Sequence, residues 1–127
     1  MEQKKILLID DEVSLCKVLK IELEHAGYQV TVAYDGLEGF NKVKEYMPDL
    51  IILDVMMPHM DGLRICRMLK FDGKFKDIPI LLLTAKGLAA DKLIGQEVKA
   101  DAYMTKPFKA EEVLACLSNL LEQNPLK

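Results

Sequence analysis

Three aspartates and one lysine, placed where short apolar runs end, are the residues of this chain that could do chemistry. Asp10 and Asp11 follow the first apolar run, Asp54 follows a second, and Lys106 follows a third. Parallel strands bring their carboxyl ends to one edge of a sheet, so we expect the four side chains to converge on one cleft. Gathered carboxylates repel one another, and a divalent cation with oxygen ligands balances them best. The pattern therefore predicts a Mg²⁺ site and phosphoryl transfer.

The size and charge of the chain limit the classes of function. Its 127 residues and formal net charge of −3 indicate one domain, residues 1–127, with no basic patch for direct nucleic acid binding and no polybasic membrane contact. No apolar stretch is long enough to span a bilayer, and no apolar signal region follows Met1. We therefore expect a cytoplasmic protein.

The three cysteines indicate no metal or redox site. Cys16, Cys66 and Cys116 are odd in number and far apart, without the close spacing of a zinc ligand pair or a cycling dithiol. Each lies in a helical pattern, so we interpret them as small core or boundary residues in a reducing cytoplasm.

Apolar runs alternate with amphipathic segments along the whole chain. Gly27 and Pro48 mark the ends of the first two helices, and the alternating segment Tyr28–Ala33 is typical of an edge strand with one exposed face. The pattern predicts strands at 5–9, 28–33, 50–53, 78–83 and 102–105, and helices at 13–26, 37–46, 63–71, 88–98 and 111–121.

This alternation predicts the fold class. Strands and helices joined by short connections favour an α/β, doubly wound, five-stranded parallel sheet of order 2-1-3-4-5, a flavodoxin-like (βα)5 fold. Its switch point lies between the first and third strands, which end at Asp10-Asp11 and Asp54. The acidic residues are thus expected where such folds bind ligands.

Five motifs in this order resemble the receiver domain of two-component response regulators, and the resemblance runs from Lys4 to about Leu121. Each motif alone is common, but five at successive strand ends are specific. They are Asp10-Asp11-Glu12, Leu53-Asp54-Val55-Met56-Met57-Pro58, Met60-Asp61-Gly62, Thr84-Ala85-Lys86 and Lys106-Pro107-Phe108.

The resemblance implies an acceptor and a metal site. Asp54 would be the phosphoacceptor, taking a phosphoryl group from a sensor histidine kinase or phosphotransfer protein. Asp11 would bind Mg²⁺ directly and Asp10 largely through water, while Asp54 and the backbone carbonyl of Met56 would complete the protein ligands.

The resemblance also implies an output. Lys106 and Thr84 would bind phosphoryl oxygens, and Thr84 and Tyr103 would act as the switch. The face made by the fourth helix, fifth strand and fifth helix would then signal to an effector protein or output domain. The residues expected to shape the loops are Pro58, Gly62 and Pro107.

The same residues allow other interpretations. Asp54 could cap a turn, Asp11 could cap the first helix, and Tyr103 could be a half-buried strand residue, but their occurrence together favours function. A flavin carrier would need a phosphate cradle where the acidic pair stands. A phosphatase would need a second acid at Met56, so we expect a phosphoacceptor without enzymatic turnover. The complete acidic and lysine set argues against a pseudo-receiver that serves only for docking.

The chain departs from the receiver pattern near the fourth helix. Many receivers have glycine where this chain has Lys99, and Gly95 weakens the helix before it. We therefore expect this helix to be the least stable. The residues after Leu121 are too few for an effector domain, so a stand-alone receiver and a piece of a longer regulator both stay open.

Overall fold

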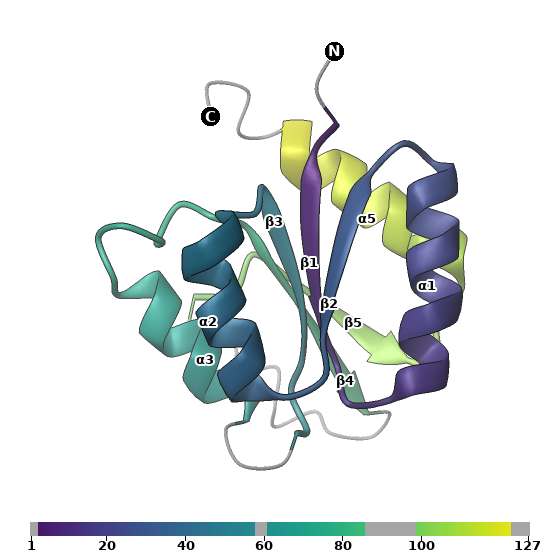
Figure 1. Cartoon of the computed structure of the whole chain (residues 1–127). Coiled ribbons are helices and arrows are strands. Elements are labelled where there is room, and N and C mark those ends of the chain that lie inside the picture. Colours follow the sequence, from purple (N-terminus) through teal and green to yellow (C-terminus); the bar gives the residue numbers. More distant parts are fainter. Residues whose placement is uncertain (1–2, 58–60, 86–98, 123–127) are drawn as a thin grey trace.

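A computed structural model describes residues 3–57, 61–85 and 99–122 of the chain as helices packed on both faces of a parallel sheet (Figure 1). The strands are β1 (Lys5–Ile9), β2 (Gln29–Ala33), β3 (Leu50–Asp54), β4 (Ile80–Ala85) and β5 (Ala102–Lys106). The described helices are α1 (Val13–His25), α2 (Gly36–Tyr46), α3 (Gly62–Lys70) and α5 (Ala110–Glu122). None of these described helices is long and apolar enough to cross a membrane.

The order of the strands is β2-β1-β3-β4-β5, and all neighbouring pairs are parallel. The doubly wound fold expected from the sequence is therefore confirmed. The helix expected at 88–98, with Gly95, lies outside the described residues, as does Pro58.

Two apolar clusters hold the layers together, one on each face of the sheet. Residues 6 and 8 of β1 face α1 and α5, whereas residues 7 and 9 face α2 and α3. This alternation is the period-two geometry of a strand, and it explains why every residue of β3 is buried. The helices contribute Cys16, Leu19, Leu23, Val113, Leu117 and Leu120 to the first cluster, and Val43, Ile65, Cys66 and Leu69 to the second.

Aspartate caps begin two of the helices. The Oδ1 atom of Asp35 accepts a hydrogen bond from the backbone N–H of Glu38 at 2.8 Å, and Asp61 does the same for Arg64 at 2.9 Å. Each carboxylate satisfies an N–H group that the first helical turn leaves without a partner.

The start of α1 differs from the capping alternative considered for Asp11. The N-cap residue is Glu12, and its side chain makes no capping hydrogen bond. Its backbone N–H instead donates to Oδ1 of Asp10 at 3.0 Å. Asp11 is exposed, and it is not the cap of this helix.

The outer strand β2 is less exposed on one face than its alternating sequence predicts. Gln29 is exposed and Thr31 is half-buried, but Ala33 is fully buried in the α2–α3 cluster. The edge position is confirmed. The side chains on the face predicted to be exposed become more buried towards the carboxyl end of the strand, because α2 covers that end.

A buried lysine sets the start of β4 two residues later than expected. Lys70, whose side chain is 7 % exposed, donates to the Ile78 carbonyl at 2.7 Å and forms an ion pair of 2.6 Å with Asp101. Pro79 has no N–H to donate, so regular pairing begins at Ile80, whose own N–H donates to Asp101 at 2.7 Å. Asp101 thus joins α3, β4 and the segment before β5.

Lys99 adopts a φ of +64°, in the left-handed region that glycine enters without steric cost. We expect Lys99→Gly to raise the free energy of unfolding by roughly 0.5–1 kcal/mol once its side-chain contact is discounted. That contact places Nζ 4.9 Å from the centre of the Phe71 ring. Urea unfolding of Lys99→Gly in the wild type and in a Phe71→Leu background separates the two effects. A lower stability in both backgrounds would contradict the backbone argument.

Candidate functional site

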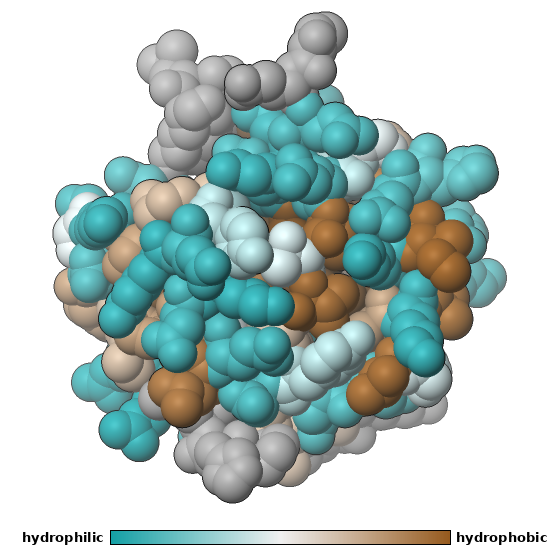
Figure 2. Space-filling view, viewed as in Figure 1, coloured by the Kyte–Doolittle hydropathy of each residue, from teal (hydrophilic) through white to brown (hydrophobic). Residues whose placement is uncertain are grey.

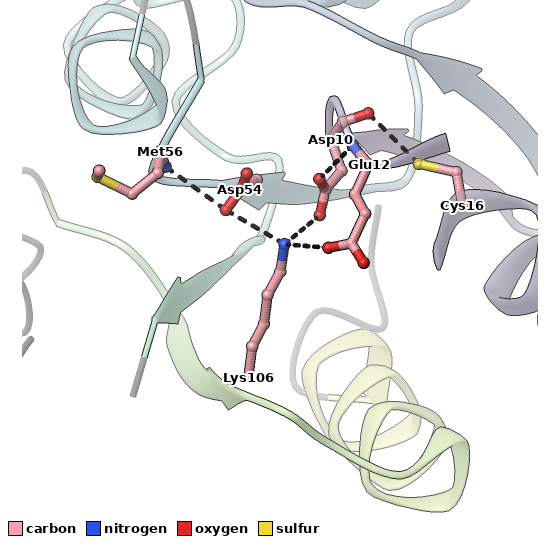
Figure 3. Close-up of polar contacts among 6 residues, drawn as sticks. All are labelled: Asp10, Glu12, Cys16, Asp54, Met56 and Lys106. Atoms are coloured by element: carbon pink, nitrogen blue, oxygen red, sulfur yellow. Dashed lines mark hydrogen bonds and ion pairs between the residues drawn. The ribbon is translucent and has the colours of Figure 1, made fainter. Parts of the chain in front are cut away.

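Three strand ends bring the predicted polar residues to one place (Figure 3). Asp10 follows β1, Asp54 ends β3 and Lys106 ends β5. The Nζ atom of Lys106 lies 2.8 Å from Oδ2 of Asp10 and 3.6 Å from Oδ1 of Asp54. One carboxylate oxygen from each of Asp10, Asp11 and Asp54 lies within 4.8 Å of the other two.

The site is buried on the sheet side and open on one side. Asp10 is 0 % exposed, Asp54 4 % and Thr84 2 %, whereas Asp11 is exposed. Lys106 reaches the cluster with 21 % of its side chain exposed. Among the described residues, the exposed carboxylate of Asp11 and the half-buried Lys106 lie beside Asp54, so a small anion would meet them at this edge of the sheet.

The two buried aspartates differ in their hydrogen bonds. Oδ1 of Asp10 is held by the backbone N–H of Glu12, while Oδ1 of Asp54 lies 3.4 Å from the backbone N–H of Met56, a weak contact. Oδ2 of Asp10 is buried and makes no properly angled hydrogen bond with the described residues, although Lys106 Nζ is near. A buried oxygen with spare lone pairs is suited to a cation.

Burial and the neighbouring charges shift the pKa values at the site. Burial and the negative charge of Asp10 together raise the pKa of Asp54 to about 6, although the ammonium of Lys106 lowers it. Burial lowers the pKa of Lys106, but the hydrogen-bonding contact and charge of Asp10, with Asp54 and Glu12, outweigh it and leave that pKa raised. Lys106 is therefore a permanent cation. Ionising Asp54 costs free energy, because burial and the charge of Asp10 both disfavour its charged form.

The residues present fit a hard divalent cation. The three carboxylates offer only oxygen ligands, and one oxygen from each lies within 4.8 Å of the others. The side chain of Met56 is 62 % exposed and points away from Asp54 in Figure 3. The use of the Met56 carbonyl as a ligand stays a prediction.

The two residues expected to form the switch lie on the neighbouring strands. Thr84 is paired with Thr105 in the β4–β5 register, one residue beyond the β4 partner of Asp54. The ring of Tyr103 packs against the α2–α3 cluster. Its hydroxyl is buried and finds no hydrogen-bond partner among the described residues, so burial raises the pKa of Tyr103. Their switching roles stay predictions.

Two of the three loop-shaping residues lie in the described structure. A Cβ atom on Gly62 would overlap the backbone carbonyl of Asp54, so the start of α3 packs directly on the end of β3. The peptide bond between Lys106 and Pro107 is cis. Pro58 lies outside the described residues.

Two contacts of the site were not predicted from the sequence. The carboxylate of Glu12 lies 3.6 Å from Lys106 Nζ and adds a third negative group around it. The thiol of Cys16 donates to the backbone carbonyl of Asp10 at 3.4 Å, and burial raises the pKa of this thiol to about 12. The acidic triplet was a visible signal for Glu12, whereas nothing in the spacing of Cys16 indicated its contact.

Comparisons with known proteins agree on one family. The family model "Response regulator receiver domain" matches residues 6–118. The chain is 45% identical over 123 residues to the alkaline phosphatase synthesis transcriptional regulatory protein PhoP of Bacillus subtilis, covering 97% of this chain and 50% of that protein. It is 44% identical over 119 residues to the DNA-binding dual master transcriptional regulator RpaA of Synechocystis, covering 94% and 49%. The chain thus spans about half the length of these relatives.

Solved structures show the same similarity. A putative response regulator from Chloroflexus aurantiacus superposes with a TM-score of 0.91 at 33% identity, covering 95% of this chain and 99% of that one. The chemotaxis protein CheY4 of Vibrio cholerae superposes with a TM-score of 0.87 at 34% identity, covering 94% and 99%.

The raised pKa of Asp54 predicts how stability depends on pH in the absence of metal. A folded-state pKa of about 6 against an ordinary value of 3.8 means that the charged carboxylate destabilises the fold above pH 6, and that this penalty disappears as pH falls towards 4. Asp54→Asn should therefore be more stable than the wild type by roughly 1–3 kcal/mol at pH 7, and the difference should shrink in mild acid. Urea unfolding in a chelator at pH 4–8 measures it. The exposed change Glu45→Gln should show no such trend, and a difference independent of pH would contradict the assignment.

The close packing of Gly62 predicts a cost for any larger residue. Gly62→Ala must displace the backbone of Asp54, so we expect it to lower the free energy of unfolding by roughly 1–3 kcal/mol. Gly73→Ala is the matched control, because a Cβ there meets nothing within 4 Å. Equal thermal stability of the two variants would show that the Gly62 contact is unimportant.

Proposed function

Because this chain belongs to the response regulator receiver family, we propose that Asp54 accepts a phosphoryl group from a phosphohistidine of a sensor kinase or phosphotransfer protein. The observation that carries the proposal is the position of Asp54, buried beside Asp10 and within 3.6 Å of the Lys106 ammonium. Asp10 is also buried and contacts Lys106, but its Oδ1 accepts from the Glu12 N–H at 3.0 Å and its Oδ2 lies 2.8 Å from Lys106 Nζ, so both of its oxygens are already engaged.

The transfer is a displacement at phosphorus. An oxygen of Asp54 forms the new O–P bond while the N–P bond of the phosphohistidine breaks, and the freed imidazole takes up a proton from water. The carboxylate must be ionised to attack. Its pKa of about 6 leaves it mostly ionised at neutral pH, and more basic than an ordinary carboxylate.

Lys106 and Thr84 stabilise the charge of the transferred group. The phosphoryl oxygens carry negative charge in transit, and Lys106 Nζ lies 3.6 Å from Oδ1 of Asp54, between this carboxylate and that of Asp10 in Figure 3. Thr84 is the next residue along β4 from the partner of Asp54, so its hydroxyl is suited to bind a second oxygen. The transfer thus needs positioned cations and donors and no further acid or base.

Mg²⁺ would be held by Asp10, Asp11 and Asp54, and when bound it supplies positive charge to the phosphoryl oxygens. The remaining work falls to the protein residues. Asp10 and Asp11 hold the open side of the site negative, so a bare anion is repelled unless their charge is balanced.

We propose a switch rather than an enzyme with turnover. Position 56 holds methionine, whose exposed side chain can give no proton to a leaving group. The acyl phosphate on Asp54 should therefore lose its phosphoryl group to water slowly. A cytoplasmic location, as expected from the sequence, stays part of this proposal.

The output would pass through Thr84 and Tyr103. The buried Tyr103 hydroxyl without a hydrogen bond is a cost that another ring position could relieve. Movement of Thr84 towards a phosphoryl group would open space near this ring. The face containing β5 and α5 would then change its partner, an effector protein or an output domain in a longer chain.

A kinase would approach over α1. A hollow of about 310 Å³ beside the site is lined by Leu15, Leu19 and Phe108, with Glu12 among its lining residues. Val18, also in its lining, is 62 % exposed, so the surface beside Glu12 is largely apolar. A donor protein that buries this surface would bring its phosphohistidine over the acidic site.

The proposal predicts a single phosphorylated residue. Incubation with acetyl phosphate and Mg²⁺ should add one phosphoryl mass to the intact protein, and tandem mass spectrometry should place it on Asp54. Asp54→Asn should abolish the modification, and Lys106→Ala should slow it on the order of 10²-fold because a stabilising charge is lost.

Two controls make this test decisive. Glu45→Gln, on an exposed part of α2, should be modified at the wild-type rate. Rapid release of inorganic phosphate without accumulation of phosphorylated protein would favour a phosphatase, and full modification of Asp54→Asn would refute the acceptor assignment.

A further inference from the structure

The outer edge of β2 presents backbone groups that no strand pairs. The N–H of Gln29 donates to the Lys4 carbonyl at 2.9 Å, and the Ala33 carbonyl accepts from the Asp10 N–H at 3.1 Å. Residues 29, 31 and 33 therefore point their backbone groups towards β1. Because these directions alternate along a strand, Val30 and Val32 point theirs outwards.

Two side chains of α2 bond this outer edge. Nζ of Lys42 donates to the Val32 carbonyl at 2.9 Å, and Oε1 of Glu38 accepts from the Tyr34 N–H at 2.7 Å. The two side chains also form an ion pair of 3.5 Å, one helical turn apart. The ion-paired side chains of Lys42 and Glu38 thus occupy one backbone acceptor and one backbone donor of this edge.

The rest of the edge opens into a hollow between α1 and α2. Its volume is about 430 Å³, and its lining includes Val30 and Val32 together with Lys17, Lys20 and Lys42. In Figure 2 apolar residues lie at the centre of this face, surrounded by hydrophilic ones. No described part of the chain fills this hollow, so it leaves the edge accessible to another strand.

The edge is complementary to itself. Two copies of β2 related by a two-fold axis at Thr31 would run antiparallel, with Val30 of one copy opposite Val32 of the other. Both residues point outwards, so each such pair would exchange two backbone hydrogen bonds. Two copies of β2 would in this way join their sheets into one. The Lys42 contact occupies one of the acceptors that this pairing needs.

We propose that the outer edge of β2 is a pairing surface for a second copy of this chain, and that Lys42 and Glu38 keep it closed. Lysine is a common residue on protected edges, because pairing would bury or crowd its charge. Here the lysine also occupies the Val32 carbonyl, and Glu38 holds it in place. The proposal concerns the unphosphorylated, metal-free protein and does not depend on the phosphoacceptor function.

The proposal separates the backbone contact of Lys42 from its charge. Lys17 lines the same hollow, is exposed, and makes no hydrogen bond or ion pair within the described residues. Lys17→Met therefore removes the same charge from the same hollow and leaves the edge contact intact. Lys42→Met removes both, while Lys42→Arg keeps a donor.

Sedimentation velocity over a wide concentration range, in chelator and without a phosphoryl donor, tests the proposal. Relative to the wild type, Lys42→Met should lower the dissociation constant of the dimer about tenfold, as expected when one competing hydrogen bond is lost. Lys17→Met and Lys42→Arg should match the wild type. Circular dichroism melts first establish that each variant is folded.

Amide exchange locates the contact. In the wild type the outward amides of Val30 and Val32 should exchange faster than that of Thr31, and concentrated Lys42→Met should protect both. Equal self-association of Lys17→Met and Lys42→Met would show that charge alone acts and would overturn the proposal. Folded Lys42→Met without any self-association, or with protection elsewhere than in β2, would overturn it as well.

Discussion

The contact of Lys106 with two buried carboxylates is the interaction on which the site depends. In this sheet β4 lies between β3 and β5, so the ends of the strands that carry Asp54 and Lys106 are about 9–10 Å apart. Only a long side chain can cross the end of β4, and Lys106 does so to bring Nζ within 3.6 Å of Asp54. The strand order thus explains the choice of lysine, and it places Thr84 on the strand between Asp54 and Lys106.

The same contact explains why the site can bind ligands and yet lowers the stability of the fold when it is empty. A buried carboxylate is destabilised by lost hydration, and Asp10 adds repulsion to Asp54. A single ammonium shared among Asp10, Asp54 and Glu12 offsets only part of this, since the pKa of Asp54 stays raised. The remaining negative charge favours the binding of a cation, and the charge of that cation then allows a phosphoryl group to approach. Stability lost in the empty site is thereby recovered when ligands arrive.

Sequence predicted the features that depend on local pattern. The apolar runs before Asp10 and Asp54 predicted the buried strands. The strict alternation of strands and helices predicted the strand order, because few topologies satisfy this alternation. The contacts that sequence missed join residues far apart in the chain. Two such contacts join Lys70 to Asp101 and Cys16 to the Asp10 carbonyl. They depend on how the helices pack on the sheet, which the spacing of residues in the sequence does not predict. The positive φ of Lys99 was left open for the same reason, since only the packed backbone decides it.

The edge strand and the acidic site are mechanically joined. The Asp10 N–H donates to the carbonyl of Ala33, the last residue of β2, so this edge strand also fixes the backbone of a residue of the acidic cluster. A second chain paired along β2 would pull on this end of the strand and would shift the carboxylate that Lys106 contacts. A receiver signals by changing its partners when it is phosphorylated. A pairing surface that is open in both the phosphorylated and the unphosphorylated state would reduce the difference between them. On this argument, the closure of the edge by Lys42 and Glu38 protects the response of the site as well as the solubility of the chain.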